Sequence, residues 1–273
     1  MVGIKSSVRV ACALATMLLF HNQVVAGQSL RVGGTGATNE MVKSLGPLLL
    51  AETGIKLEVI PGLGTVGGNK AVADGVIDLS ISGRVLKPAE TARGLIAVAE
   101  FRTPFGLVTS HPNPNGFKSS EIAPLYQSDA PVWADGTPIL IILRPSVESD
   151  NSVLSQMFPG MSAAMAKARD RSDVPVAATD QDNTEMAEGT PGSLIAATFT
   201  QISMEKRKLW FVAIDGVAPS VENYEKGSYP YGKSLYFVLA AQKSPAGERF
   251  LAFLRSPMGA AALRDAGVLL SAR

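Results

Sequence analysis

The sequence contains very little cysteine, histidine and aromatic residue. Its 273 residues include one cysteine, two histidines and 6% Phe, Trp and Tyr. Cys12 and His21 lie in an N-terminal segment that we expect to be removed, which leaves His111 as the one histidine of the mature chain. Zinc and transition-metal sites rely mainly on His and Cys. We therefore expect no metal centre and no disulfide, so the mature protein must be held together by its own core.

Long apolar runs are also missing. The longest, at residues 10–20, falls short of the roughly 20 residues that a membrane-spanning helix needs. It follows Lys5 and Arg9 and is followed by small residues at 24–26, which is the pattern of a secretory signal peptide. We expect export through the Sec pathway, cleavage after Ala26, and a mature protein in the bacterial periplasm.

A surplus of charge of either sign is absent as well. The chain has 25 Lys and Arg against 24 Asp and Glu, and loss of Lys5 and Arg9 would leave one more acidic than basic residue. A protein that binds nucleic acid or an anionic membrane usually carries a clear basic surplus. Neither partner is therefore expected.

What is present is an alternation of strand and helix patterns. Short apolar runs at residues 30–32, 56–60 and 78–82 predict strands, and residues 39–52 and 67–74 between them have helical spacing. This βαβαβ order predicts an α/β fold with a parallel sheet. Two helices are predicted near the C-terminus, at residues 246–254 and 257–266. Further strands are predicted at residues 95–99, 104–109, 139–143, 175–178, 194–199, 209–214 and 235–241.

Two glycine-rich turns follow the first two predicted strands. The sequences GGTGATN (33–39) and GLGTVGG (62–68) both place Gly and Thr between a strand and a helix. The first amides of a helix have no partner within it, and glycine lets the backbone direct them to one point, so such a turn can bind an anion. Both turns lie at the edge of the sheet where open α/β folds bind ligands. In the simpler interpretation, Thr38 or Asn39 merely caps the helix.

Two nucleotide-binding motifs are approached but not met. A dinucleotide fingerprint would need a third glycine at the position of Asn39 and an acidic residue at the end of the second strand. The sequence GSYPYGKS (227–234) matches the phosphate-loop pattern, but a strand-like segment follows it where that motif requires a helix. We therefore expect no nucleotide cofactor.

Covalent catalysis also lacks support in the sequence. No GxSxG occurs, and a triad built on His111 has no other feature in its favour. The carboxylate pairs Asp170 with Asp173 and Asp180 with Asp182 are interpreted as solvated residues or helix caps. Reversible binding is therefore a better hypothesis than enzymatic turnover, although a secreted hydrolase of small esters remains an alternative.

Several segments together carry a family resemblance: GTGATNEMV, LGTVGGNKAVADGVIDLSISG, IDGVAPSVENYEKGSYP, LYFVLA and the tail SPAGERFLAFLRSPMGAAALRDAGVL. In this order they resemble the periplasmic phosphate-binding proteins, which are type II solute-binding proteins of ABC importers. The resemblance implies two α/β lobes, each a mostly parallel sheet flanked by helices. Residues 27–104 and 234–273 would form the first lobe, and residues 105–233 the second.

The resemblance also implies a function. A monomer would capture a small oxyanion, phosphate or phosphate-like, in the cleft between its lobes and deliver it to an ABC permease in the inner membrane, without a cofactor. The alternatives are a sensory or scaffold binding protein for another anion, such as sulfate or a carboxylate, and a degenerate member that binds no ligand.

The ligand-binding residues implied by the family pattern match this chain in part. Thr38, Asn39 and Thr65 match the positions in the two glycine turns, and Arg144 matches the arginine that follows a strand. The family has an acidic residue after the third strand, where this chain has Gly83 and then Arg84. If Arg84 faces the cleft, it would favour an anion without a proton to donate. An ordinary surface position for Arg84 is the other interpretation.

The segment after Arg144 departs from the family pattern as well. PSVESDNSV (145–153) replaces the expected glycine and threonine cluster, and it brings in Glu148 and Asp150, which oppose an anion. Ser149, Asn151 and Ser152 remain candidate donors at a helix start.

Overall fold

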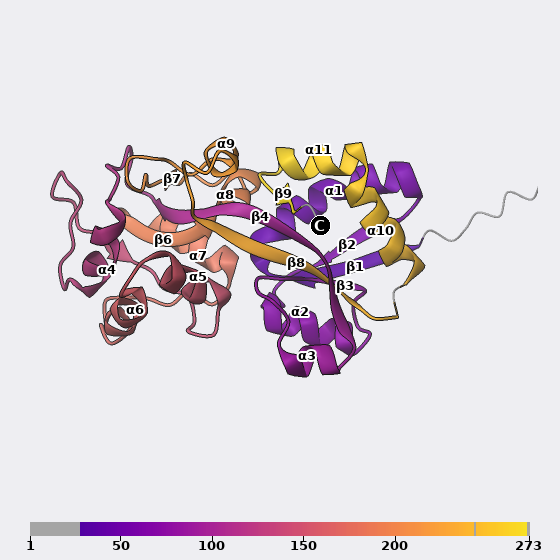
Figure 1. Cartoon of the computed structure of the whole chain (residues 1–273). Coiled ribbons are helices and arrows are strands. Elements are labelled where there is room, and N and C mark those ends of the chain that lie inside the picture. Colours follow the sequence, from indigo (N-terminus) through magenta and orange to yellow (C-terminus); the bar gives the residue numbers. More distant parts are fainter. Residues whose placement is uncertain (1–27, 243, 272–273) are drawn as a thin grey trace, which may run out of the picture.

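The computed structural model describes residues 28–242 and 244–271, so the expected signal peptide lies outside the described residues. Figure 1 shows two lobes joined by long strands. Across the described segments, the helices are all too short or too polar to cross a membrane.

The first lobe begins with the predicted βαβαβ unit. Strand β1 (Ser29–Gly34) lies between β2 (Lys56–Ile60) and β3 (Leu79–Ser82), and both pairings are parallel. Helix α1 (Asn39–Thr53) connects β1 to β2 after the short 3-10 turn η1 (Gly36–Thr38), and α2 (Gly64–Ala73) connects β2 to β3. The parallel sheet follows from these crossover helices, since parallel neighbours cannot be joined by a tight turn.

Helix α1 shows why this segment folds as it does. Met41, Val42, Leu45 and Leu49 recur on one face and are fully buried or nearly so. Each buried side chain of this size contributes about 1.5 to 3 kcal/mol. The helix ends at Gly54, whose φ of 73° is the left-handed conformation that glycine adopts without strain.

Two antiparallel strands cross between the lobes, β4 (Leu95–Thr109) and β8 (Gly232–Ala240). Sequence patterning predicted two separate strands for the β4 region, and the structure has one. Pro104, which has no amide to donate, lies where the pairing of β4 passes from β8 to the second-lobe strand β6 (Ser193–Thr198). A proline, which cannot donate the backbone hydrogen bond to a neighbouring strand, is tolerated where the strand changes its pairing partner.

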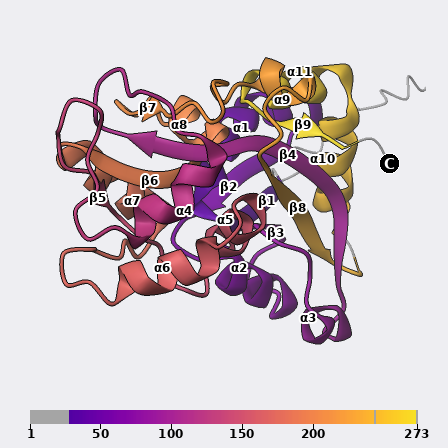
Figure 2. The ribbon, with the colours of Figure 1, turned by 60° about the vertical axis from the view of Figure 1, so that its left-hand side comes forward.

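The sheet runs continuously through the molecule in the order β2-β1-β3-β8-β4-β6-β5, with β7 and β9 also paired to β4. The short strand β5 is parallel to β6. Most helices of the second lobe pack around this end of the sheet (Figures 1 and 2). The elements not yet given are α3 (Pro88–Ala92), α4 (Ser119–Gln127), β5 (Leu140–Ile141), α5 (Ser149–Met157), α6 (Met161–Arg169), α7 (Asp180–Gly189), α8 (Phe199–Met204), β7 (Trp210–Phe211), α9 (Val221–Glu225), α10 (Pro245–Arg255), α11 (Pro257–Asp265) and β9 (Leu269–Leu270).

Each lobe has its own hydrophobic core. One core combines residues of β1 to β3 and α1 with Phe250, Leu254 and Leu263 from the two C-terminal helices, so both ends of the chain build the first lobe. The other core is made by residues between Phe105 and Tyr229. Two crossing strands join the two cores. They leave a space between the lobes in which a ligand can be enclosed. The exact lobe borders stay a prediction.

Candidate binding site between the lobes

A partly enclosed cavity of about 90 Å³ lies between the lobes. Its wall comes from the turn before α1, the start of α2, the residue before α5 and the start of α7, so the N-terminal ends of several helices meet there. Unpaired helix amides and the positive end of the helix dipole favour a negative charge at such a point. The lining residues are Gly36, Gly62, Leu63, Gly64, Arg144, Glu148, Ala178, Thr179, Asp180 and Gln181.

The first glycine turn is shaped by close approach of the backbone. Gly34 has a φ of 124°, and a Cβ there would lie 2.2 Å from the Ile81 carbonyl oxygen of the neighbouring strand. Thr38 is buried, and its hydroxyl donates to the Thr35 carbonyl at 3.0 Å, within the same turn. Asn39 is the first residue of α1 and is also buried. Gly36 of this turn lines the cavity and the Ala37 amide donates to Asp180 at 3.1 Å, while the Thr38 hydroxyl supports the turn itself.

Arg144 is the cation of the cavity wall. It is 5% exposed; its Nη1 donates to the Ala177 carbonyl at 2.7 Å and its Nη2 to Asp180 Oδ1 at 3.3 Å. Glu148 lies farther away, with its carboxylate 3.9 Å from Nη2. The buried Nε has no hydrogen-bond partner in the part of the chain that the structure describes. A buried donor without a partner is costly, so this atom is a natural contact for a bound ligand or water.

Thr65, Gly83 and Ser149 come together beside the cavity, across the lobe boundary. The Gly83 amide donates to Thr65 Oγ1 at 2.9 Å. A Cβ at position 83 would lie 2.5 Å from Ser149 Oγ and 3.2 Å from Thr65 Oγ1. The absence of a side chain at position 83, which departs from the family pattern, therefore allows the two lobes to approach closely here.

Arg84 is held on another side of the first lobe. Its two terminal nitrogens donate to both carboxylate oxygens of Glu90 on α3, at 2.8 and 2.9 Å. The hydrogen bonds from Arg84, together with those from the Lys87 amide and Asn69, lower the pKa of Glu90 from 4.5 to about 2. A paired guanidinium of this kind is not free to bind ligand, so this arrangement opposes the prediction that Arg84 contacts the anion.

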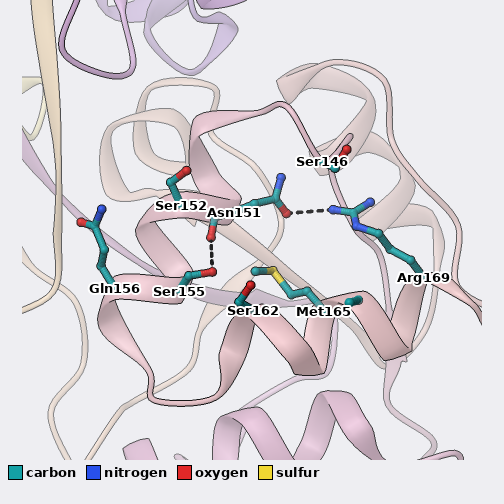
Figure 3. Close-up of a pocket in the computed structure, with 9 residues that line it drawn as sticks. Ser146, Asn151, Ser152, Ser155, Gln156, Ser162, Met165 and Arg169 are labelled. Carbon is teal, nitrogen blue, oxygen red and sulfur yellow. Dashed lines mark hydrogen bonds between the residues drawn. The ribbon is translucent and has the colours of Figure 1, made fainter. Parts of the chain in front are cut away.

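Asn151 and Ser152 line a different hollow, the open groove between α5 and α6 (Figure 3). Asn151 donates to the Pro145 carbonyl at 2.7 Å and accepts from Arg169 at 2.9 Å, and Ser152 is exposed. Helix α5 begins at Ser149, and each further residue turns by about 100° around the axis. The wall of the cavity between the lobes includes Glu148, just before α5, but not Asn151 or Ser152, so the role of these two residues as ligand donors stays a prediction.

Comparison with known proteins defines the family. A family model described as PBP superfamily domain matches residues 22–257. The chain belongs to the PBP superfamily. No curated protein sequence matches it. Its fold is that of the type II periplasmic binding proteins, as the resemblance implied.

Solved structures of this superfamily share the fold at low sequence identity. A putative phosphate ABC transporter substrate-binding protein with bound phosphate from Clostridium perfringens has a TM-score of 0.76 and 16% identity, covering 90% of this chain and 100% of that one. An ABC-type phosphate transport receptor from Vibrio cholerae has a TM-score of 0.59 and 13% identity, with 89% and 100% covered. The periplasmic molybdate-binding protein of Azotobacter vinelandii has 0.61 and 11%, also with 89% and 100% covered.

Asp180 and Gln181 line the cavity of this superfamily member, and sequence reasoning missed them. We interpreted Asp180 and Asp182 as solvated residues or caps, and Asp182 does cap α7, exchanging hydrogen bonds with Thr179. Asp180 is 8% exposed and accepts hydrogen bonds from the first lobe instead. Gln181 donates to the Gly36 carbonyl at 2.9 Å, also across the lobes. The signal in the sequence was the position of Asp180 and Gln181, two polar residues directly after the capping Thr179.

The phosphate-loop pattern at residues 227–234 is explained by the fold. Gly232 and Lys233 begin strand β8, so the helix that the motif requires is not there and rejection of that motif is confirmed. Lys233 is 1% exposed and pairs with the buried carboxylate of Asp150 at the start of α5. This pair ties a crossing strand to the second lobe next to the cavity of this PBP superfamily member.

The pH response of binding should depend on Glu148. Burial raises the pKa of Glu148 above its usual 4.5; Asp180 and Asp150 add to the rise, whereas Arg144 and Lys233 oppose it. The ionised carboxylate at the cavity wall repels an anion at neutral pH. In Glu148→Gln we therefore expect affinity for an oxyanion to increase about fivefold or more.

The difference between Glu148→Gln and the wild type should shrink as the pH falls from about 7.5 to about 5.5, because a raised pKa brings the protonation of Glu148 closer to neutral pH than that of an ordinary glutamate. Both proteins are titrated calorimetrically with the same anion at both pH values. The protonation of the anion itself affects both proteins equally, so it cancels when their Kd values are compared. Weaker binding by Glu148→Gln at both pH values would contradict this expectation and would make Glu148 an acceptor for a proton on the ligand.

Proposed function

We propose that this protein captures a small oxyanion, phosphate or phosphate-like, between its lobes in the periplasm and delivers it to an ABC permease. The observation that carries the proposal is the buried guanidinium of Arg144, with an unpartnered Nε, at a cavity where helix N-termini from both lobes meet. Proteins of the same fold that are named for phosphate and molybdate support the ligand class. Export and action as a monomer are part of this proposal.

The size of the cavity supports a small ligand. The space of about 90 Å³ has room for only a few water-sized groups, which suits a ligand as compact as a tetrahedral anion. Half of the lining residues are Gly, Ala or Thr, which leave the backbone accessible, and backbone donors are held at fixed positions. A rigid set of donors selects for the geometry of an ion better than a flexible one.

The crossing strands supply the means of closure. With the lobes apart, the anion would bind first to the amides of the two glycine turns, and rotation about β4 and β8 would then bring Arg144 and Ser149 to it. A ligand stabilises the closed form only through contacts that the open form lacks. Arg144 provides such contacts because it belongs to the lobe opposite the glycine turns.

Enzymatic function has less support. His111 stacks on Trp133 with ring centroids 4.9 Å apart and lies 3.7 Å from the exposed Asp135, within the second lobe. Among the described residues, no group of His, Cys, Asp and Glu could hold a metal ion. Neither a triad nor a metal centre is assembled at the cavity by these residues, so capture without turnover is the function that we propose.

Calorimetric titration tests the proposal. Residues 27–273, unfolded and refolded to remove bound ligand, are titrated with phosphate, sulfate, molybdate and small carboxylates. We expect saturable binding of one anion per chain, with phosphate among those bound. If only sulfate or a carboxylate binds, the proposal of anion capture stands and the assignment of phosphate as the ligand is rejected. Silence across the panel from a folded protein would reject the proposal.

A further inference from the structure

The carboxylate of Asp180 occupies the position that the donors of the cleft define for an anion. Its Oδ2 accepts from the Ala37 amide at 3.1 Å and from the Thr35 hydroxyl at 3.2 Å. Its Oδ1 accepts from Arg144 Nη2 at 3.3 Å. A backbone amide before a helix, a hydroxyl and an arginine are the groups that bind a free oxyanion. Here a side chain of the protein itself binds to all of them.

These hydrogen bonds connect the two lobes. Asp180 begins α7 in the second lobe, whereas Thr35 and Ala37 belong to the turn before α1 in the first lobe. The neighbouring Gln181 donates to the Gly36 carbonyl at 2.9 Å. The fit is close, because a Cβ at Gly36 would lie 2.5 Å from Gln181 Oε1 and 3.0 Å from Asp180 Oδ2. Asp180 therefore makes contacts that exist only when the lobes are together.

We propose that Asp180 is an internal ligand: its carboxylate holds the lobes closed and competes with the external anion for the Ala37 amide and Arg144. This inference rests on the proposed function for the competing anion, but the closure that it describes does not require one. A protein that is already closed on its own carboxylate binds a ligand less tightly, because the ligand must first displace that carboxylate. The apparent Kd for the anion is inversely proportional to the fraction of the protein in which the binding site is free of that carboxylate.

Asp180→Asn and Asp180→Ala test the proposal. Removal of the carboxylate should open the lobes in the absence of anion, seen as a larger radius of gyration by small-angle X-ray scattering. It should also tighten anion binding by about tenfold or more, if the competent form is about a tenth of the wild type. Adding phosphate should compact the variants more than it compacts the wild type.

Asp182→Asn is the matched control. It removes the same charge from the same helix turn, but among the described residues the hydrogen bonds of the Asp182 side chain stay within that turn, with Thr179. We expect its radius of gyration and Kd to match the wild type once its fold is verified by circular dichroism. Gln181→Ala provides a second test in case the Asp180 variants misfold. It removes another hydrogen bond between the lobes and leaves Asp180, the partner of Arg144, in place. It should open the lobes partly and tighten binding to a smaller degree.

The outcomes separate this inference from the proposed function. Unchanged radius and unchanged Kd in the Asp180 variants would overturn the inference and leave anion capture standing. Weaker binding by both variants would also overturn it, because Asp180 would then be a ligand contact. If the Asp180 variants open but bind none of the anions in the panel, both the proposed competition by Asp180 and the proposed function would be overturned.

Discussion

Replacement of Arg144 by alanine should weaken oxyanion binding by about 10- to 150-fold. A hydrogen bond to a charged group is worth about 1.5 to 3 kcal/mol, and each 1.4 kcal/mol is a factor of ten in Kd. Arg144 is buried at the wall of the cavity, and its Nε has no hydrogen-bond partner among the described residues. Calorimetric titration of Arg144→Ala against the wild type with the same anion measures the loss.

Arg84→Ala is the control for that experiment. It removes the same charge from the chain, but the guanidinium of Arg84 is bound to Glu90 on α3. We expect the Kd of Arg84→Ala to stay within about twofold of the wild type, because exposed or distant charges add little. Thermal melting by circular dichroism checks that both variants are folded. An unchanged Kd in Arg144→Ala would remove Arg144 from the site.

Replacement of Lys233 by methionine should destabilise the protein by about 3 to 5 kcal/mol, because removing one partner of a buried ion pair leaves the other charge without compensation. Lys233 and Asp150 are 1% and 6% exposed, and the Lys233 ammonium also lies 5.8 Å from the Phe105 ring centre. Urea unfolding of Lys233→Met, followed by circular dichroism, measures the loss of free energy.

The double variant Lys233→Met with Asp150→Asn shows whether the pair is the cause. Removal of both charges leaves no uncompensated ion, so the double variant should recover most of the stability that Lys233→Met loses. A loss below about 1 kcal/mol in Lys233→Met would mean that water reaches Asp150 and that the pair does not fix α5 to the crossing strand.

The architecture was largely predictable because it depends on repeated local patterns. The short apolar runs of β1 to β3 and the helical spacing of Met41, Leu45 and Leu49 can be recognised without knowledge of distant contacts. The two C-terminal helices, predicted from residues 246 and 257, begin at Pro245 and Pro257, each directly after a capping serine. The length of β4 was missed because a proline inside a strand normally ends it, and only the change of pairing partner makes Pro104 tolerable.

The site was less predictable because it is assembled from both lobes. Arg144 follows a buried strand and could be aligned with a family pattern, and the structure brings it to the cavity. The orientation of Asn151 and Ser152 depends on the residue at which α5 begins, and a shift of one residue turns a side chain by about 100°. The partner of Arg84, Glu90, and the first-lobe partners of Asp180 are set by tertiary contacts that no local pattern encodes.

The central claim is that a small oxyanion binds between the lobes at Arg144. Crystals grown with arsenate, a phosphate analogue, test it most directly through an anomalous difference map collected at the arsenic absorption edge. We predict one strong peak in the cavity lined by Arg144, within hydrogen-bond distance of its guanidinium and the Ala37 amide, with the Asp180 carboxylate displaced. A peak elsewhere, such as the groove between α5 and α6, with the cavity empty, would contradict the claim.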